Sequence, residues 1–155
     1  MNLNVEPKDI IDAYSTPIVQ QTSFWSKVKE KLGMDSRAFE FSARNSELYT
    51  DVGGYSYTHA DVIMFFQQLN SEDYIAYIPY GPEIEPSEAN QGEFLEELSE
   101  ELRSFLPKNC IAMRYDLNWE SHWCKQEDFD SDGNWIGLPK KRVPGNKTEH
   151  RHVQP

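Results

Sequence analysis

The chain has 155 residues, a formal net charge of -11, and no apolar run that approaches the roughly 18 residues needed to cross a bilayer. Hydrophobic residues make up 38% of it, which excludes a largely disordered protein and predicts one globular core. The acidic balance excludes an autonomous nucleic-acid binder, because such a surface repels a phosphate backbone. The N-terminus lacks a signal-peptide pattern, so we expect a cytoplasmic protein without an integral membrane segment.

The first predicted element is a helix that begins after Thr22. Apolar residues recur at helical spacing from there to Gly33, Thr22 can cap the first turn and Gly33 can end the last. Residues 37–42 then alternate between apolar and polar, which predicts a half-buried strand. A loop is expected over residues 45–54.

Two apolar runs, residues 62–66 and 74–78, are separated by a short polar segment and predict a β-hairpin. Pro79 and the Gly81-Pro82 pair end its second strand.

An amphipathic helix is predicted from Gly92 to Leu106, with glutamates on its outer face. Residues 110–115 are short and apolar, which predicts a strand buried in the sheet behind that helix. The order helix, strand, hairpin, helix, strand indicates an α/β or α+β fold, with a mixed central sheet flanked by helices. Residues 121–155 form an irregular polar tail without periodicity.

Two charged positions are candidates for function. Asp116 follows the apolar strand that carries Arg114, so its carboxylate should emerge at the sheet's end beside a cation, where α/β folds place ligands. A structural ion pair would give the same pattern. Lys27 lies on the first helix, where a solvated lysine is the ordinary interpretation.

The sequence predicts no metal site. Residues 128–134 copy the start of a calcium loop, but position twelve is Pro139 instead of a glutamate, which favours a polar turn. The remaining candidate ligands match no zinc spacing, and the two cysteines are expected to be reduced thiols. These residues are His122, Cys124, Asp128, His150 and His152, with Cys110 as the second cysteine.

Glycine motifs that cradle phosphates are missing from the sequence, including GxGxxG and any glycine-rich loop before Lys-Ser or Lys-Thr. Acetyltransferases that use coenzyme A need bare backbone N–H groups next to its pyrophosphate. This argues against a stand-alone, coenzyme A-dependent N-acyltransferase.

Several segments, taken in their order and spacing, resemble the first half of the FemABX family (FemA, FemB and FemX), the peptidoglycan interpeptide-bridge aminoacyltransferases. Residues 20–29 are similar to the family's early helix, in which a Gln, a Trp and a following Lys recur. Residues 77–82 resemble a strand that ends in a Gly-Pro turn. Residues 94–106 and 111–116 are similar to its helix followed by a strand ending in an aromatic and an Asp.

The resemblance implies a GNAT-like acyltransferase domain over residues 1–120, with residues 121–155 leading into a second GNAT-like domain that this chain lacks. It implies that the enzyme needs no cofactor and takes an amino acid from aminoacyl-tRNA. The acceptor would be the stem peptide of a UDP-muramyl peptide or its lipid-linked form. Such an enzyme would work in the bacterial cytoplasm or at the inner face of the membrane.

Carried over by position, Lys27 would neutralise substrate phosphate, and Asp116 would contact the acceptor amine or assist its deprotonation. Trp25 and Arg114 would be further substrate-binding residues. Two other functions stay open at this point: a catalytically silent α/β module for binding or scaffolding, and the coenzyme A-dependent N-acyltransferase.

Overall fold

The computed structural model of the chain describes residues 1–119, 129–134 and 136. The chain divides into two compact units, Met1–Trp119 and Glu120–Pro155. The strands of the first unit are β1 (Leu3–Lys8), β2 (Ser36–Arg44), β3 (Tyr57–Gln68), β4 (Tyr74–Pro79) and β5 (Cys110–Asp116). Its α-helices are α1 (Ser23–Glu30), α2 (Asn45–Leu48) and α3 (Gln91–Arg103), with short 3-10 turns η1 (Ile10–Asp12), η2 (Val19–Gln21) and η3 (Glu88–Asn90).

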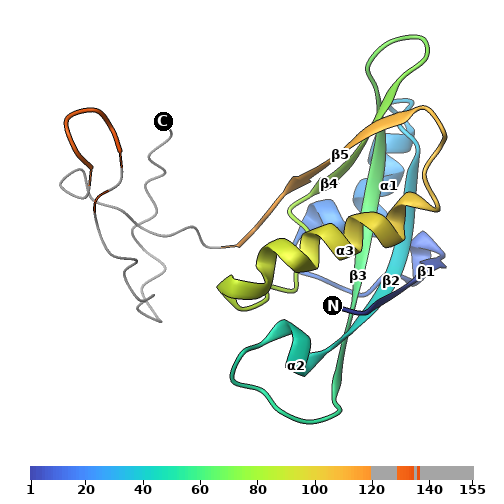
Figure 1. Cartoon of the computed structure of the whole chain (residues 1–155). Helices are drawn as coiled ribbons and strands as arrows, with labels where there is room; N and C mark the ends of the chain where they lie inside the picture. Colours follow the sequence, from blue (N-terminus) through green and yellow to red (C-terminus); the bar gives the residue numbers. More distant parts are fainter. Residues whose placement is uncertain (120–128, 135, 137–155) are drawn as a thin grey trace. The chain divides into compact units, whose positions relative to one another are not determined.

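The five strands form one mixed sheet in the order β1-β2-β3-β4-β5. All neighbouring pairs are antiparallel except β4 and β5, which run parallel. A parallel pair cannot be joined by a tight turn, and α3 supplies the crossover between them. Figure 1 shows α3 crossing one face of the sheet, with α1 behind the other. The class is α+β, with a mixed sheet and helices, as the sequence predicts.

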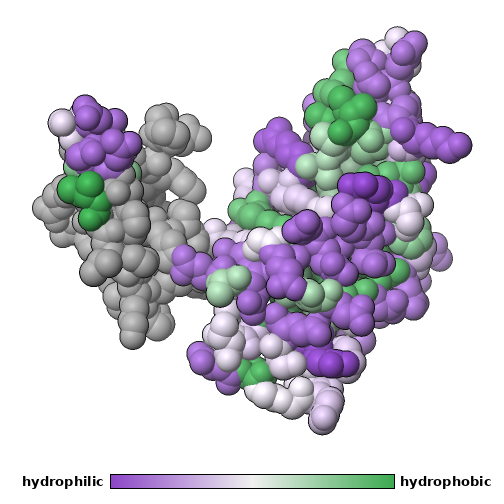
Figure 2. Space-filling view, in the orientation of Figure 1, coloured by the Kyte–Doolittle hydropathy of each residue, from purple (hydrophilic) through white to green (hydrophobic). Residues whose placement is uncertain are grey.

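The main core lies between α3 and the sheet. Phe94, Leu98 and Leu102 recur every four residues, so they form one apolar stripe on α3, and all three are fully buried. They pack on a row of large side chains that includes Phe41 and Met64. Glutamates occupy the outward positions of α3, and Figure 2 shows this side of the molecule as mostly hydrophilic.

A smaller core fills the opposite face, under α1. Ala38, Ile63 and Phe65 are buried there, and Trp25 packs against them from α1. The helix begins as predicted, because the Thr22 hydroxyl accepts a hydrogen bond from the Trp25 backbone N–H at 3.3 Å. The two faces of the sheet are called the α3 face and the α1 face below.

Four local expectations need correction. β1 was not predicted at all, and β3 begins at Tyr57, well before the apolar run at residues 62–66. The expected loop over residues 45–54 begins with the helix α2. β5 was expected to be buried, but within residues 1–119 it is an edge strand of the sheet, and Ile111 is 62% exposed. In this part of the chain no further strand pairs with its outer edge, while Met113 and Tyr115 pack on the core under α3.

In the second unit, residues 129–134 contain the predicted polar turn. Asp130 accepts hydrogen bonds from the backbone N–H groups of Asp132 and Asn134, at 2.9 and 2.8 Å. Hydrogen bonds from Asn134 hold the pKa of Asp130 below its ordinary value. The other residues considered for metal binding, His122, Cys124, Asp128, Pro139, His150 and His152, lie outside the described residues.

The helices of the first unit are short. Among the described residues, none of them is long and apolar enough to span a membrane.

Candidate functional site

Asp116 and Arg114 lie together at the end of β5, as the sequence predicts. The Arg114 guanidinium donates to the Asp116 carboxylate from two nitrogens, at 3.1 and 3.3 Å. Tyr77 on β4 donates its hydroxyl proton to the other carboxylate oxygen. The Arg114 guanidinium also lies 5.1 Å from the centre of the Tyr77 ring. Two side chains thus hold the carboxylate in one orientation while part of it stays open to solvent.

This cluster lies on the α1 face, where two parallel strands end. In the β4–β5 register, Tyr77 lies beside Arg114 and Pro79 beside Asp116. Phe65, which packs under α1, is the neighbour of Tyr77 on β3. The Asp116 side chain remains 34% exposed and the Arg114 side chain 62% exposed. Because ligands of open sheets bind beyond the carboxyl ends of the strands, this is the first candidate site.

Two tyrosines of β4 and β5 resist ionisation. Burial and the hydrogen bond to Asp116 raise the pKa of Tyr77 to about 12. Burial raises the pKa of Tyr115 to about 12, although its hydrogen bond with Ser99 acts in the opposite direction. Both phenols therefore remain proton donors at neutral pH, and Tyr77 keeps donating to Asp116.

We expect the folded protein to lose stability as the pH rises from 10 toward 12. Below pH 10 the Tyr77 phenol is protonated in both states, so its contribution is fully present there. Above that pH the unfolded chain loses this proton first, which favours unfolding until the folded-state pKa of about 12 is passed. Urea denaturation across this range should show a shallower decline for Tyr77→Phe than for the parent protein. The control, Tyr55→Phe at a position 89% exposed, should leave the decline unchanged.

The two other predicted site residues lie on α1. Trp25 is half-buried against Ala38, Ile63 and Phe65, and the Lys29 ammonium lies 5.1 Å from the centre of its ring. Lys27 is exposed on the same helix. The structure thus puts α1 and Asp116 on one face of the sheet. Within residues 1–119 no contact joins the Lys27 side chain to Asp116.

Gln21 fills the point where β4 separates from β3. Its carboxamide oxygen accepts from the Ile63 N–H at 2.7 Å, and its nitrogen donates to the Ile63 carbonyl at 3.2 Å and the Pro79 carbonyl at 2.7 Å. Pro79 has no N–H to offer Ile63, so the Gln21 side chain takes the place of a ladder partner. The side chain is buried, and residue 21 is only 4% exposed.

Gly81 allows this arrangement. A Cβ at this position would lie 3.1 Å from the Gln21 Cδ and 3.2 Å from a methyl group of Ile78. The chain turns sharply here, with a φ of 51° at Tyr80. Glycine at 81 therefore lets the turn pack directly on the Gln21 carboxamide.

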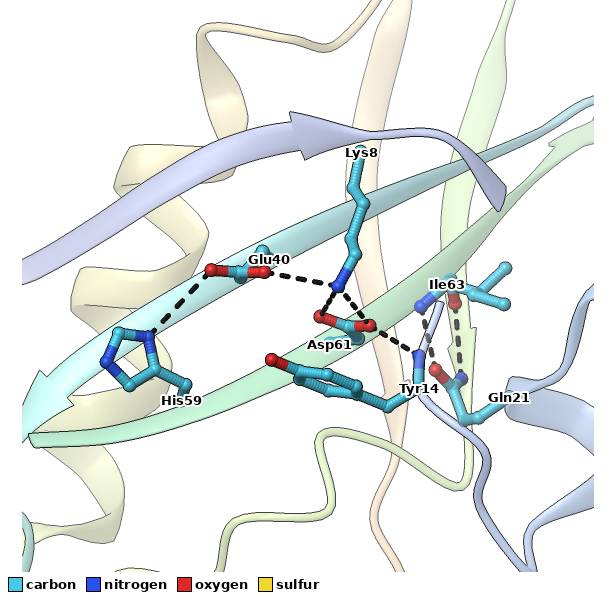
Figure 3. A network of polar contacts seen from close by, with 7 residues as sticks. All are labelled: Lys8, Tyr14, Gln21, Glu40, His59, Asp61 and Ile63. Atoms are coloured by element: carbon cyan, nitrogen blue, oxygen red, sulfur yellow. Dashed lines mark hydrogen bonds and ion pairs between the residues drawn. The ribbon is translucent and has the colours of Figure 1, made fainter. Parts of the chain in front are cut away.

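A network of charged side chains occupies the same face at β1, β2 and β3 (Figure 3). The Lys8 ammonium bonds the Asp61 carboxylate at 3.0 Å and the Glu40 carboxylate at 3.1 Å, and it lies 4.0 Å from the centre of the Tyr14 ring. The Tyr14 N–H also donates to Asp61, at 2.6 Å, and the His59 Nδ1 lies 3.8 Å from Glu40. Asp61 thereby ties the segment before α1 to the sheet.

The charge on Lys8 is stable in this network. Burial lowers the pKa of Lys8, but the hydrogen bonds from Lys8 to Asp61 and Glu40 outweigh it and leave the pKa above its ordinary value. The Lys8 side chain is 18% exposed and the Asp61 side chain 8%. Because each charge has a partner, we assign the network a structural role.

An open pocket of about 410 Å³ adjoins the network. Its lining includes His59 and Asp61 of β3 and the segment 83–85, which follows the turn at Gly81. Gln21, Tyr14 and Tyr49 also line it. Among the described residues, the lining holds three carboxylates and no lysine or arginine, which suits a cationic group.

Sequence reasoning missed Tyr77 and Gln21 as members of the site. Tyr77 was placed correctly on a strand, and its contact with Asp116 follows from the parallel register of β4 and β5. A βαβ pattern was present in the sequence and could have suggested that register. Nothing in the sequence marks Gln21 as buried, because its partners are backbone groups of two distant strands.

We compared the chain with family models, with curated proteins and with solved structures, and found no match in any of the three.

Proposed function

We propose that this chain is the first GNAT-like domain of a FemABX-like aminoacyltransferase. The enzyme would transfer an amino acid from aminoacyl-tRNA to the stem peptide of a peptidoglycan precursor. One observation carries the proposal: three of the four segments on which the resemblance rests, residues 20–29, 77–82 and 111–116, meet around Pro79. Gln21, from the first segment, bonds its carbonyl, and Asp116, from the last, lies beside it on β5. Gln21 and Asp116 each lie far from Pro79 along the chain, so their meeting does not follow from sequence order alone.

The arrangement of elements also supports the proposal. β4 ends in a Gly-Pro turn, and α3 is followed by a strand that ends in Tyr115 and Asp116. The sheet is mixed and carries helices on both faces. These are the features that the resemblance implies for this half of the enzyme.

The chemistry of the transfer gives Asp116 a clear role. The acceptor amine attacks the carbonyl carbon of the aminoacyl ester, a C–N bond forms, the ester C–O bond breaks, and the ribose hydroxyl of the tRNA leaves with a proton. The carboxylate already accepts from Tyr77 and Arg114. It is therefore better suited to attract and orient the acceptor ammonium group than to be its only base.

Lys27 can bind the phosphate of the precursor, because it is an exposed cation on the same face as Asp116. Lys27→Ala should raise the KM for the UDP-linked precursor about tenfold and change kcat less than about twofold. Lys108→Ala is the matched control, since Lys108 is exposed just before the opposite end of β5. Steady-state kinetics of both variants would decide the assignment. An unchanged KM in Lys27→Ala would remove Lys27 from the site.

The direct test uses the protein as its gene encodes it, purified and mixed with charged tRNA and UDP-muramyl pentapeptide. Mass spectrometry should show a precursor that is heavier by one aminoacyl residue. The reading frame that follows should encode a second acyltransferase-like domain. Binding of the precursor without any transfer, in a protein with no second domain, would favour the silent binding module instead.

A further inference from the structure

The edge of β3 lacks a neighbouring strand over half its length. β4 pairs with β3 only from Phe65 to Gln68, whereas β2 pairs with it from Tyr57 to Phe65. Within residues 1–119, the part of β3 that precedes Ile63 thus pairs with a strand on one side only. The pocket opens on the other side. Within residues 1–119, this edge is open to an extended ligand.

The orientation of its backbone groups follows from Gln21. Because Gln21 bonds both the N–H and the C=O of Ile63, these groups face away from β2. Backbone groups alternate along a strand, so those of Asp61 and His59 face the same way. No hydrogen bond within residues 1–119 uses the backbone N–H or C=O of these two residues on that side. The backbone hydrogen-bonding groups of His59 and Asp61 are thus open on this side, and Gln21 occupies those of Ile63.

The segment 83–85 adds charge to the pocket. Glu83 is exposed and lines the pocket, as do Glu85 and Asp61. Lys8 offsets Asp61 from the far side of β3 without lining the pocket. A ligand that pairs with the open backbone groups of β3 and carries an amine would therefore meet complementary groups on β3 and in the segment 83–85.

We propose that the open edge of β3 binds the acceptor stem peptide, as a short added strand whose side-chain amine faces Glu83. This inference rests on the function proposed above and adds to it the way the acceptor is recognised. The placement fits the first site, because Gln21 lines the pocket and also bonds Pro79, the neighbour of Asp116. In the bound precursor Glu83 thus holds the amine, which must move from there to Asp116 for the transfer itself.

His59→Pro tests the backbone part of the proposal. It removes the N–H of the open rung, and proline is tolerated where a strand N–H faces away from the ladder. His59→Ala is the matched control, since it removes the imidazole and keeps the N–H. The probe is a synthetic stem pentapeptide with a central lysine, titrated calorimetrically into the full-length protein. We expect affinity to fall at least about tenfold in His59→Pro and less than about twofold in His59→Ala.

Glu83→Gln tests the charge, and it keeps the proposal testable if His59→Pro unfolds, because Glu83 is exposed. This variant should bind the lysine peptide about fivefold more weakly than the parent protein does. Its affinity for the same peptide with an acetylated lysine should equal that of the parent protein. The parent protein should itself prefer the free amine. In backbone NMR spectra, the amides of His59 and Asp61 should shift when peptide is added.

Several results would overturn the inference. One is a folded His59→Pro variant that binds the stem peptide as tightly as the parent protein, and another is a parent protein that binds the free and the acetylated lysine peptides equally. The others are NMR shifts confined to strands other than β3, and an unrelated lysine peptide that binds as tightly as the stem peptide. The outcome is separable from that of the proposed function. If His59→Pro transfers the amino acid with an unchanged KM for the acceptor, the peptide does not bind at this edge, but the proposed aminoacyltransferase function stands. If the peptide binds at the edge and no transfer occurs, the binding site stands and the proposed function is wrong.

Discussion

Gln21→Leu should lower the free energy of unfolding by about 3 kcal/mol. Leucine is close in size to glutamine, so the packing changes little, but three hydrogen bonds disappear. The N–H and C=O of Ile63 and the C=O of Pro79 would lose their partner at the centre of the sheet. A buried polar group without a partner costs about 1–3 kcal/mol, and water from the adjoining pocket can satisfy some of them.

Urea denaturation followed by circular dichroism measures this change. The control is Gln20→Leu, at the preceding, half-buried position of η2. It should change the midpoint only slightly. Equal losses in the two variants would show that the Gln21 carboxamide is not the partner on which β3 and β4 depend.

Asp116→Asn should reduce kcat for aminoacyl transfer about 100-fold. Asparagine has nearly the same shape and can still accept the Tyr77 hydroxyl, so the end of β5 should stay in place. What disappears is the negative charge that attracts the acceptor ammonium group. Arg114 also loses its counter-ion and becomes a net positive charge beside that ammonium, which adds repulsion.

Single-turnover transfer from charged tRNA at saturating precursor measures the loss, and melting curves check the fold. Tyr77→Phe should show a smaller reduction, about tenfold, because it leaves the charge and removes one of its two orienting donors. Asp51→Asn, at an exposed turn, is the charge-matched control. Transfer by Asp116→Asn within about twofold of the parent enzyme would contradict the role given to the carboxylate.

Regular periodicity in the sequence was enough to predict α3, β2, β4 and the capped start of α1. In α3 and β2, apolar residues that set the pattern are ones that the fold buries, as Phe94, Leu98 and Leu102 show. The pattern of α1 differs, because Phe24 and Leu32 stay 64% and 73% exposed. β1 has only Leu3 and Val5 as buried residues and contains Pro7, so the local signal was too weak. It becomes a strand because β2 offers a free edge beside it.

The early half of β3 was missed for a similar reason. Thr58, His59 and Asp61 do not suggest a strand, and their conformation depends on pairing with β2. The ion pair between Arg114 and Asp116 could be predicted because both residues lie on one short strand. The Gln21 contacts could not, since they require knowledge of where β4 leaves β3.

The Gln21 carboxamide also limits which strands can pair with the open edge of β3. A bare strand edge is a template on which other chains can polymerise, and proteins block such edges with interruptions. Here a side chain occupies the rung at Ile63, so a strand from another molecule cannot run unbroken along β3. The gap that remains at this edge admits a segment of only a few residues, which favours short chains over long ones there.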